Sequence, residues 1–410
     1  MNTSIDVLYV KNIPDMPAKL FKSSQRMLQV QSPIIPTVAN LIEQNPGTIS
    51  LGQGIVYYGP PEKSMTILNQ PGQSLEFNKY GSSQGLPELI MLVGNKLKSE
   101  NNIDIRSTSK IIITAGANMA FLNVLFAITD PDDEIILNTP YYFNHDMAIN
   151  MLSCKTVVVS TDDQYQLQPE KILAAITKKT RAIVTVSPNN PTGAIYPANA
   201  LQKINQICAD NGVYHISDEA YENFIFDDGA HFSPASLEDA QNHTISLFSL
   251  SKAYGFAAWR VGYMVIPEYL QEAVIKAQDT NLICPPLASQ CAAIGALETG
   301  SDYCREKSSL IHDVRNELLE KLSCLGNFCQ YPSSGGALYI FLKLDTELSD
   351  MEVTEYLIEN HQVAIIPGHT FGMGDHCYIR VSYGALDKES ATEGIQRLIS
   401  GLTAIMNKEI

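Results

Sequence analysis

Between residues 110 and 265 the chain alternates short runs rich in isoleucine and valine with segments that carry a helical pattern. Strands that are apolar along their whole length are buried on both faces, which is typical of parallel sheets covered by helices on either side. The alternation therefore predicts an α/β fold with a mainly parallel, doubly wound central sheet. The expected strands are Lys110–Thr114, Glu134–Leu137, Thr156–Ser160, Ala182–Val186, Val213–Ser217, Thr244–Phe248 and Val261–Val265, with helices over Ala117–Ile128, Pro169–Thr177 and Pro197–Asn211.

After Ser301 the pattern changes to long helices separated by isolated strand-like runs. This mixture is typical of a smaller α+β domain, and 410 residues are enough for two hydrophobic cores. We predict an N-terminal arm (residues 1–50) that packs on the small domain, a large domain (51–300) and a small C-terminal domain (301–410). The small domain is expected to contain helices over Asp302–Leu325, Met351–Asn360 and Asp387–Asn407, and strands over Gly336–Leu344 and Tyr378–Tyr383.

Charge and cysteine usage exclude several classes of protein. The chain has 28 Lys and Arg against 44 Asp and Glu, a net charge of −16, and no basic run. Nucleic-acid binding needs clustered positive charge, so no nucleic-acid partner is expected. No apolar stretch reaches the roughly 18 residues of a membrane span, and the N-terminus lacks the apolar core of a signal peptide. The eight cysteines are scattered without a Cys-x-x-Cys pair, so we expect a cytoplasmic protein without a bound metal.

Four groups of polar residues follow predicted strands. Each has an ordinary structural interpretation: a glycine turn at Gly116, a Pro/Asn/Gly loop around Asn190, a helix cap at Asp218 and a solvated loop lysine at Lys252. Because the carboxyl ends of parallel strands meet at one edge of a sheet, however, we expect the four groups to lie together. The groups are Thr114–Asn118, Ser187–Gly193, His215–Tyr221 and Ser246–Lys252.

Together these residues fit a pyridoxal cofactor better than four unrelated loops. A lysine supplies the amine for a Schiff base, and a carboxylate keeps the ring nitrogen protonated so that the ring can act as an electron sink. The phosphate needs backbone amides at a helix start, hydroxyls and an arginine. Asp218, Lys252 and Arg260 supply the charged members of this set.

The segment Ser-Leu-Ser-Lys-Ala-Tyr-Gly-Phe-Ala-Ala-Trp-Arg-Val-Gly at 249–262 resembles the lysine-attachment signature of class I/II pyridoxal-phosphate-dependent aminotransferases, which have fold type I. The match spans the whole signature, and the resemblance continues in the right order from about Gly52 to Arg380. It implies transamination between an L-amino acid and a 2-oxo acid by a ping-pong mechanism, with pyridoxal 5′-phosphate as cofactor.

The resemblance implies roles around the cofactor. Lys252 is the Schiff-base lysine and proton shuttle, and Asp218 pairs with the ring nitrogen. Asn190 and Tyr221 bind the phenolic oxygen of the ring, and Tyr142 stacks on its face. The phosphate site comprises Gly116, Ala117, Asn118, Ser249, Ser251 and Arg260.

Substrate and subunit contacts are implied as well. Arg380 matches the arginine that binds the α-carboxylate of the substrate, assisted by Gly54 and Asn190. Tyr80 resembles the tyrosine that reaches the phosphate from the neighbouring subunit, so the resemblance implies a homodimer. The peptide bonds Thr139–Pro140 and Asn190–Pro191 are expected to be cis, and a buried Lys252 is expected to titrate below the ordinary lysine range.

The chain departs from the usual pattern in two loops. Ser187 replaces the first Asn of Asn-Pro-x-Asn-Pro-Thr-Gly, although Asn190 is kept. The loop Ile55–Tyr58 is apolar and aromatic, and it lies over the substrate side chain in relatives, so an uncharged amino acid is expected. The combination of Thr-Ala-Gly-Ala-Asn at 114–118 with Pro-Tyr-Tyr-Phe-Asn at 140–144 most resembles the plant and cyanobacterial branch that handles aromatic amino acids and methionine.

Two alternatives stay open at this point. Other pyridoxal chemistry on the same fold, such as C–S β-elimination or cyclopropane formation, shares the residues around the cofactor. A non-catalytic regulator built on this fold would carry an added DNA-binding module. Only about 50 residues precede the Gly52 motif, and they lack a basic helix-turn-helix pattern, which disfavours the regulator.

Overall fold

A seven-stranded sheet forms the centre of the chain in a computed structural model, which describes residues 23–69, 77–227, 229–332 and 334–409. Its strands follow the order β2-β8-β7-β6-β5-β3-β4. All seven predicted strands are present in this sheet, so the predicted central sheet is confirmed. The strands are β2 (Ser109–Thr114), β3 (Glu134–Thr139), β4 (Lys155–Ser160), β5 (Thr180–Val186), β6 (Tyr214–Asp218), β7 (Thr244–Ser249) and β8 (Gly262–Pro267).

Five neighbouring strands of this sheet, β4, β3, β5, β6 and β7, pair in parallel. β8 is antiparallel to both of its neighbours, β7 and β2. The antiparallel direction of β8 was not predicted, because its apolar run looks like those of the parallel strands. Since β2 and β7 still run in the same direction as the other strands, their carboxyl ends lie at the edge where β6 ends.

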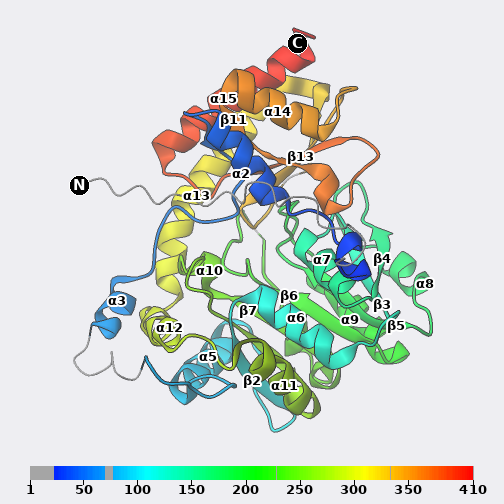
Figure 1. Cartoon of the computed structure of the whole chain (residues 1–410), viewed down its shortest axis with the longest axis vertical. Coiled ribbons are helices and arrows are strands. Elements are labelled where there is room, and N and C mark those ends of the chain that lie inside the picture. The colour runs from blue at the N-terminus through cyan, green and yellow to red at the C-terminus, as the bar shows by residue number, and fades with distance from the viewer. Residues whose placement is uncertain (1–22, 70–76, 228, 333, 410) are drawn as a thin grey trace, which may run out of the picture.

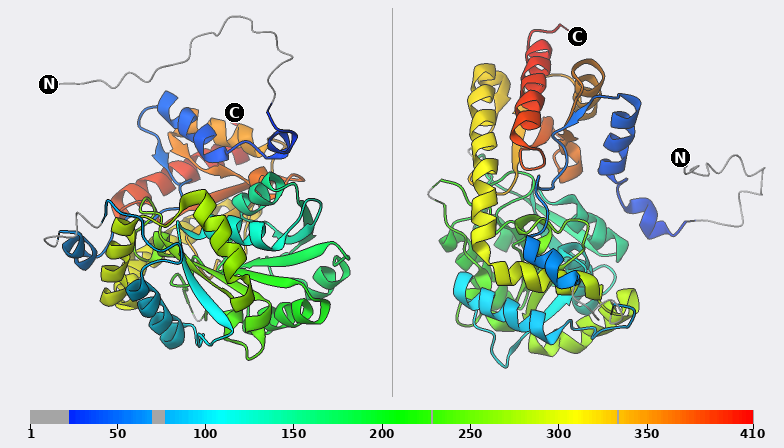
Figure 2. Two further views of the ribbon diagram at one scale, coloured as in Figure 1. Left: turned by 60° about the horizontal axis from the view of Figure 1, so that its bottom comes forward. Right: turned by 90° about the vertical axis from the view of Figure 1, so that its left-hand side faces the viewer.

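Helices cover both faces of the sheet (Figures 1 and 2). Adjacent strand residues point to opposite faces: Ile135 belongs to the apolar cluster under α6, whereas Ile136 packs with α9. Burial of both faces explains why the strands are apolar throughout. The helices of this part of the chain are α3 (Glu62–Leu68), α5 (Pro87–Glu100), α6 (Ala117–Ile128), α7 (Phe143–Met151), α8 (Pro169–Ala174), α9 (Ala198–Asn211), α10 (Leu250–Ala253), α11 (Gln271–Leu282) and α12 (Leu287–Thr299).

A smaller C-terminal domain contains a four-stranded antiparallel sheet of order β12-β13-β10-β9. Phe341 on β10 faces Arg380 on β13 across this sheet. The helices pack on it and appear in yellow to red in the upper part of Figure 1. The elements are α13 (Ser301–Leu322), β9 (Cys329–Gln330), β10 (Tyr339–Leu344), α14 (Asp350–His361), β11 (Val363–Ala364), β12 (Ile366–Pro367), β13 (Cys377–Ser382) and α15 (Lys388–Met406).

The described N-terminal segment begins with α1 (Gln25–Gln29) and α2 (Ile34–Gln44), followed by β1 (Ile49–Ser50), which pairs with β11. Ile34 and Val38 of α2 share an apolar cluster with Ile358 and Phe371. Residues 1–22 of the predicted arm lie outside the described residues, and the domain limits at 50 and 300 stay a prediction. Within the described ranges, no helix combines the length and the apolar character that crossing a bilayer requires.

Candidate active site

A cavity of about 360 Å³ opens at the carboxyl edge of the central sheet, next to the small antiparallel sheet. It collects most of the residues predicted for the site from strand ends that are far apart in the sequence. β6 ends in Asp218, β7 ends in Ser249, and two residues separate the end of β2 from the start of α6. The predicted residues that line it are Gly54, Ala117, Asn118, Tyr142, Asn190, Asp218, Tyr221, Ser249, Ser251, Lys252, Arg260 and Arg380.

Asp218 is a buried carboxylate at the inner wall of the cavity, 4% exposed. Its Oδ1 accepts a hydrogen bond from the backbone N–H of Ala220 at 3.1 Å, and its Oδ2 lies 3.1 Å from Nε2 of His145. Burial of a carboxylate is costly unless it is paired. Oδ1 is thus held by the backbone. The imidazole of α7 lies beside Oδ2, but its Nε2 makes no hydrogen bond among the described residues.

Lys252 lies on the short helix α10, directly after β7. The side-chain oxygen of Ser249 caps this helix by accepting from the N–H of Ser251. The Lys252 amine donates to the backbone carbonyl of Gly54. Burial, together with the positive charges of Arg380 and Arg260, lowers the pKa of Lys252 to about 8, which confirms the expected direction. The amine is therefore less strongly protonated than an ordinary lysine and closer to its nucleophilic form.

The start of α6 provides free backbone amides beside a guanidinium group. Gly116 caps the helix with a φ of +80°, and a Cβ at this position would overlap the Arg260 guanidinium. Arg260 itself has a φ of +54° and donates to the carbonyls of Ala257 and Ala115 at 2.8 and 3.4 Å, and to Ser251 Oγ at 3.5 Å. Helix-start amides, an arginine and serine hydroxyls together are suited to bind an anion, and this group is called the anion-binding corner below.

Arg380 extends from β13 of the small sheet into the cavity and is 2% exposed. One Nη donates to Asn190 Oδ1 at 2.9 Å, and the other donates to the carbonyl of Gly52 at 2.7 Å. The guanidinium also lies 4.4 Å above the centroid of the Tyr339 ring. Its Nε has no hydrogen-bond partner among the described residues, so this buried cation keeps capacity for an anion.

Two phenols flank the cavity. The hydroxyl of Tyr142 donates to Asn118 Oδ1 at 3.3 Å and accepts from Asn144 Nδ2 at 2.8 Å. The oxygen of Tyr221 accepts from Asn190 Nδ2 at 3.4 Å. Burial raises the pKa of both phenols, so both stay protonated near neutral pH and can act as donors.

The loop that carries Asn190 has two cis peptide bonds, Ser187–Pro188 and Asn190–Pro191, and a third joins Thr139 to Pro140. The two predicted cis bonds are confirmed, and the one after Ser187 was not predicted. Ser187, which replaces the usual Asn, accepts a hydrogen bond from the N–H of Tyr196 at 3.1 Å. The substitution therefore keeps a contact within the loop and leaves Asn190 free to face the cavity.

Three sequence predictions do not match the cavity of this chain. Gly116 does not line it and instead caps α6 beside Arg260. Tyr80 is 80% exposed and does not line it, and its expected role in a neighbouring subunit stays a prediction. The loop Ile55–Tyr58 was expected to cover the substrate, but none of its residues lines the cavity. The Tyr58 hydroxyl instead donates to the carbonyls of Lys252 and Ala253, both at 3.1 Å, so it is held at the backbone of α10.

Several lining or contacting residues were missed in the sequence. His145 follows Tyr142 by three residues, and this helical spacing places both on one face; their rings lie 5.2 Å apart. Tyr339 begins β10, in a Gly-Gly-Ala-Leu-Tyr segment read only as a strand. Pro33 and Ile35 reach the cavity from the start of α2, and no motif marked them.

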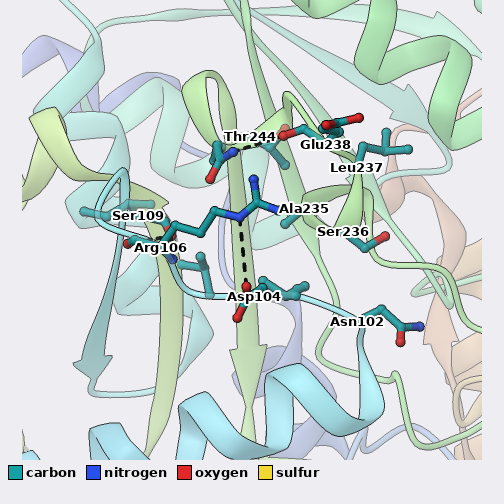
Figure 3. A pocket seen from close by; sticks show the side chains of 13 residues that line it. Asn102, Asp104, Arg106, Ser109, Ala235, Ser236, Leu237, Glu238 and Thr244 are labelled. Atoms are coloured by element: carbon teal, nitrogen blue, oxygen red, sulfur yellow. Dashed lines mark hydrogen bonds and ion pairs between the residues drawn. The ribbon is translucent and has the colours of Figure 1, made fainter.

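A second cavity, of about 50 Å³, lies at the opposite edge of the sheet (Figure 3). Ser109 and Thr244, which begin β2 and β7, contribute to its wall. Arg106 is the charged residue at its centre, and Nε lies 4.0 Å from Asp104 Oδ2. This cavity gathers none of the predicted site residues. Among the described residues, no group of three or more His, Cys, Asp or Glu is placed to hold a metal ion.

The observed residues fit pyridoxal phosphate. The anion-binding corner at Arg260 would take the phosphate, and the buried carboxylate of Asp218 would face a protonated ring nitrogen. Asn190 and Tyr221 offer donors for a phenolic oxygen, and Lys252 supplies the amine. Arg380 leaves a donor for a carboxylate beyond the ring.

The chain matches the family described as aminotransferase class I and II over residues 46–398. It is 32% identical to the aromatic aminotransferase ISS1 of Arabidopsis thaliana, over 94% of this chain and 97% of that protein. It is 33% identical to a probable aspartate/prephenate aminotransferase of Aquifex aeolicus, over 80% of this chain and 84% of that protein. The crystal structure of an aromatic aminotransferase from Pyrococcus horikoshii superposes with a TM-score of 0.82 at 30% identity, covering 91% of this chain and all (100%) of that one.

Proposed function

This chain belongs to the class I and II aminotransferases, and we propose that it transfers the amino group of an aromatic or methionine-like L-amino acid to a 2-oxo acid by a ping-pong mechanism. It is a pyridoxal-phosphate-dependent enzyme. The bound cofactor supplies an electron sink for the charge that develops when the α-proton of the substrate is removed. The observation that carries the proposal is the joint placement of Lys252, Asp218 and Arg380 around one cavity.

Lys252 is proposed to attach the cofactor and, once displaced by the incoming amine, to move the proton at the α-carbon of the substrate. A proton-transfer group works best when its pKa lies near the working pH. The lowered pKa of Lys252, about 8, meets this condition. The carbonyl of Gly54 accepts from the amine and so holds it on the cavity side of α10.

Asp218 and Arg380 are proposed to hold the two charged ends of the reacting group. Asp218 keeps a proton at the ring nitrogen, because a buried carboxylate stabilises a cation beside it. Arg380 binds the α-carboxylate, and its guanidinium geometry favours two parallel hydrogen bonds to that anion. Orientation from both ends brings the α-carbon to the amine of Lys252.

The remaining cavity wall favours an uncharged side chain. Among the described lining residues, the cations are Lys252, Arg260 and Arg380, and each has a proposed task. None is left over for a second substrate carboxylate. Pro33, Ile35 and Phe143 add apolar surface to the wall, which suits an aromatic or thioether side chain.

We further propose that the protein acts as a cytoplasmic homodimer. The exposed Tyr80 would reach the phosphate corner of the neighbouring subunit, in keeping with the sequence resemblance. The backbone N–H of Gly81 contacts Cys284 Sγ at 3.2 Å, which anchors the residues around Tyr80 to the chain. Light scattering of the purified protein tests the dimer, and a monomer at micromolar concentration would contradict it.

The substrate is tested by a half-reaction panel. Purified enzyme is mixed with single amino acids, and the loss of the visible absorption band of the cofactor is followed. Tyr, Phe, Trp and Met are expected to react fastest, with equimolar formation of the 2-oxo acid and without ammonia release. Faster reaction with Asp or Glu would contradict the proposed substrate class, and ammonia release would indicate lyase chemistry instead.

The assignment of Lys252 is tested by Lys252→Ala. This variant should lose transamination, because none of the other described residues that line the cavity carries an amine to attach the cofactor. It should still bind the cofactor non-covalently. Full activity of Lys252→Ala would overturn the assignment. Lys276→Ala, at a surface lysine that pairs with Glu272 on α11, is a matched control and should keep wild-type activity.

A further inference from the structure

Tyr339 enters the cavity from the first position of β10, on the small sheet. Its side chain is 1% exposed, and its hydroxyl oxygen lies 2.7 Å from that of Tyr221. The two rings meet edge to face, with centroids 5.5 Å apart. The phenol is therefore a fixed part of the wall, although none of the roles proposed above uses it.

A closed ring of contacts surrounds the two phenols. The Arg380 guanidinium covers the face of Tyr339 and donates to Asn190 Oδ1, while Asn190 Nδ2 donates to the oxygen of Tyr221. The Tyr221–Tyr339 hydrogen bond completes the ring. The ring connects the group proposed to bind the substrate carboxylate with the groups proposed to bind the phenolic oxygen of the cofactor.

The direction of the hydrogen bond between the phenols follows from a count of protons. A phenol has one proton to donate, and the oxygen of Tyr221 already accepts from Asn190. If Tyr221 donates its proton to the phenolic oxygen of the cofactor, the bond between the two tyrosines must use the proton of Tyr339. A bond donated to its oxygen makes Tyr221 a stronger donor, because hydrogen bonds in a chain polarise one another.

We propose that Tyr339 is a positioning residue that acts through Tyr221 and strengthens the hydrogen bond from Tyr221 to the phenolic oxygen of the cofactor. This inference rests on the proposed role of Tyr221. Gly54 supports it, because a Cβ on Gly54 would overlap the Tyr339 hydroxyl. A glycine here leaves the phenol room to point at its partner.

The charged groups that share the cavity with this pair are Arg380 from β13, Asp218 from the end of β6, and Lys252 and Arg260 from α10 and the loop after it. Burial raises the pKa of the Tyr339 phenol, and the positive charge of Arg380 acts against this effect. Tyr339 therefore keeps its proton across neutral pH and is available as a donor.

Tyr339→Phe removes the hydroxyl and keeps the ring under Arg380. Enzyme reconstituted with pyridoxal phosphate is titrated, and the pH midpoint of its visible absorption band is recorded. A strong donor stabilises negative charge on the phenolic oxygen and so favours the deprotonated form of the lysine-bound cofactor. Loss of the hydroxyl should move the midpoint upward by roughly half to one pH unit. Cofactor affinity of the cofactor-free protein should fall severalfold.

Two further variants separate this role from a structural one. In a Tyr221→Phe background, Tyr339→Phe should cause no further shift, because the two residues act as one unit. Tyr383→Phe removes another buried hydroxyl, which donates to the Gly336 carbonyl at 3.1 Å, and should change only the melting temperature. An unchanged midpoint in Tyr339→Phe, or an equal shift in the Tyr221→Phe background, would overturn the proposal. A wild-type enzyme without a visible band or amine transfer would instead contradict the proposed function.

Discussion

His215 and Asp218 are buried polar residues three positions apart on strand β6. The hydrogen bonds around His215 are complete, whereas those around Asp218 are not. The ring of His215 is enclosed: Nε2 lies 2.9 Å from Thr185 Oγ1, and Nδ1 lies 3.0 Å from Asn205 Nδ2. Asn205 also donates to Thr244 Oγ1 at 2.7 Å. Burial lowers the pKa of His215 to about 3, so this cluster is neutral and its hydrogen bonds are used up within the protein.

The region around Asp218 is charged and incompletely satisfied. Arg380 Nε and both ring nitrogens of His145 have no hydrogen-bond partner among the described residues. Unsatisfied buried donors cost stability, and charges cost more. The difference between the two regions shows that buried polar residues alone do not identify a ligand-binding site in this sheet. Residual capacity for a ligand distinguishes the Asp218 region from the His215 region.

The largest expected effect concerns the charge at Asp218. Asp218→Asn keeps the shape but removes the negative charge, so the cofactor's ring nitrogen loses its proton and the electron sink weakens. We expect kcat to fall by roughly 10²–10³-fold, with a melting temperature close to that of the wild type. A variant with nearly full kcat would show that the charge at this end of β6 is not catalytic.

Next in size is the effect at Arg380. Arg380→Lys keeps the positive charge. A lysine ammonium lacks the planar guanidinium, so it cannot hydrogen-bond Asn190 and form two parallel hydrogen bonds to a carboxylate at the same time. Steady-state kinetics should show a KM for the amino acid raised by roughly 10- to 100-fold, with a smaller fall in kcat. An unchanged KM would remove Arg380 from the substrate site.

At the enclosed cluster we expect the reverse pattern. His215→Leu leaves Asn205 and Thr185 without their buried partner, which should cost about 1–3 kcal/mol of stability. Activity per folded molecule should stay at the wild-type value, because the cluster lies away from the cavity. Urea denaturation and kcat are measured on the same preparation. A large loss of kcat without a loss of stability would contradict the purely structural role of the His215 cluster.

The last prediction concerns pH and the stability of the cofactor-free protein. The folded pKa of Lys252, about 8, lies below its ordinary value of 10.5. The unfolded chain therefore binds more protons between these values, so the lysine destabilises the folded state fully below pH 8 and ceases to do so by about pH 10.5. Lys252→Met should melt at a higher temperature than wild type at pH 7.

The pH series supplies its own control. The difference between Lys252→Met and wild type should shrink as the pH rises from 8 towards 10.5, because the wild-type amine becomes neutral in both states. A difference that stays constant over this range would show that the stabilisation comes from packing rather than from the charge. All melting curves are recorded after removal of the cofactor.

The sequence was sufficient for the large sheet because its signals are local. Ile and Val runs identify the seven strands. Asp218 ends β6, and Gly116, Asn190 and Lys252 lie two to four positions past the ends of β2, β5 and β7. The topology of an α/β sheet then places these residues at one edge, because the carboxyl ends of parallel strands lie together. Their spatial clustering needed no knowledge of long-range packing.

What could not be predicted depends on contacts between distant segments. The antiparallel direction of β8 depends on the route of the chain, since its run Gly262–Pro267 resembles the others. Tyr339 meets Tyr221 only because the small sheet packs against the end of the large one. Tyr58 was expected to face the substrate, but its hydroxyl finds two backbone carbonyls at α10. A sequence motif does not show which distant backbone groups a side chain will contact.

The hydrogen bond between Arg380 and Asn190 joins a strand of the small sheet to a loop of the large one. A carboxylate that binds Arg380 would therefore contact a residue that already joins the two sheets. Ligand binding and the contact between the small and the large sheet are thermodynamically linked, so each must strengthen the other. The contact between the two sheets is therefore expected to be stronger while substrate is bound and weaker after the product leaves.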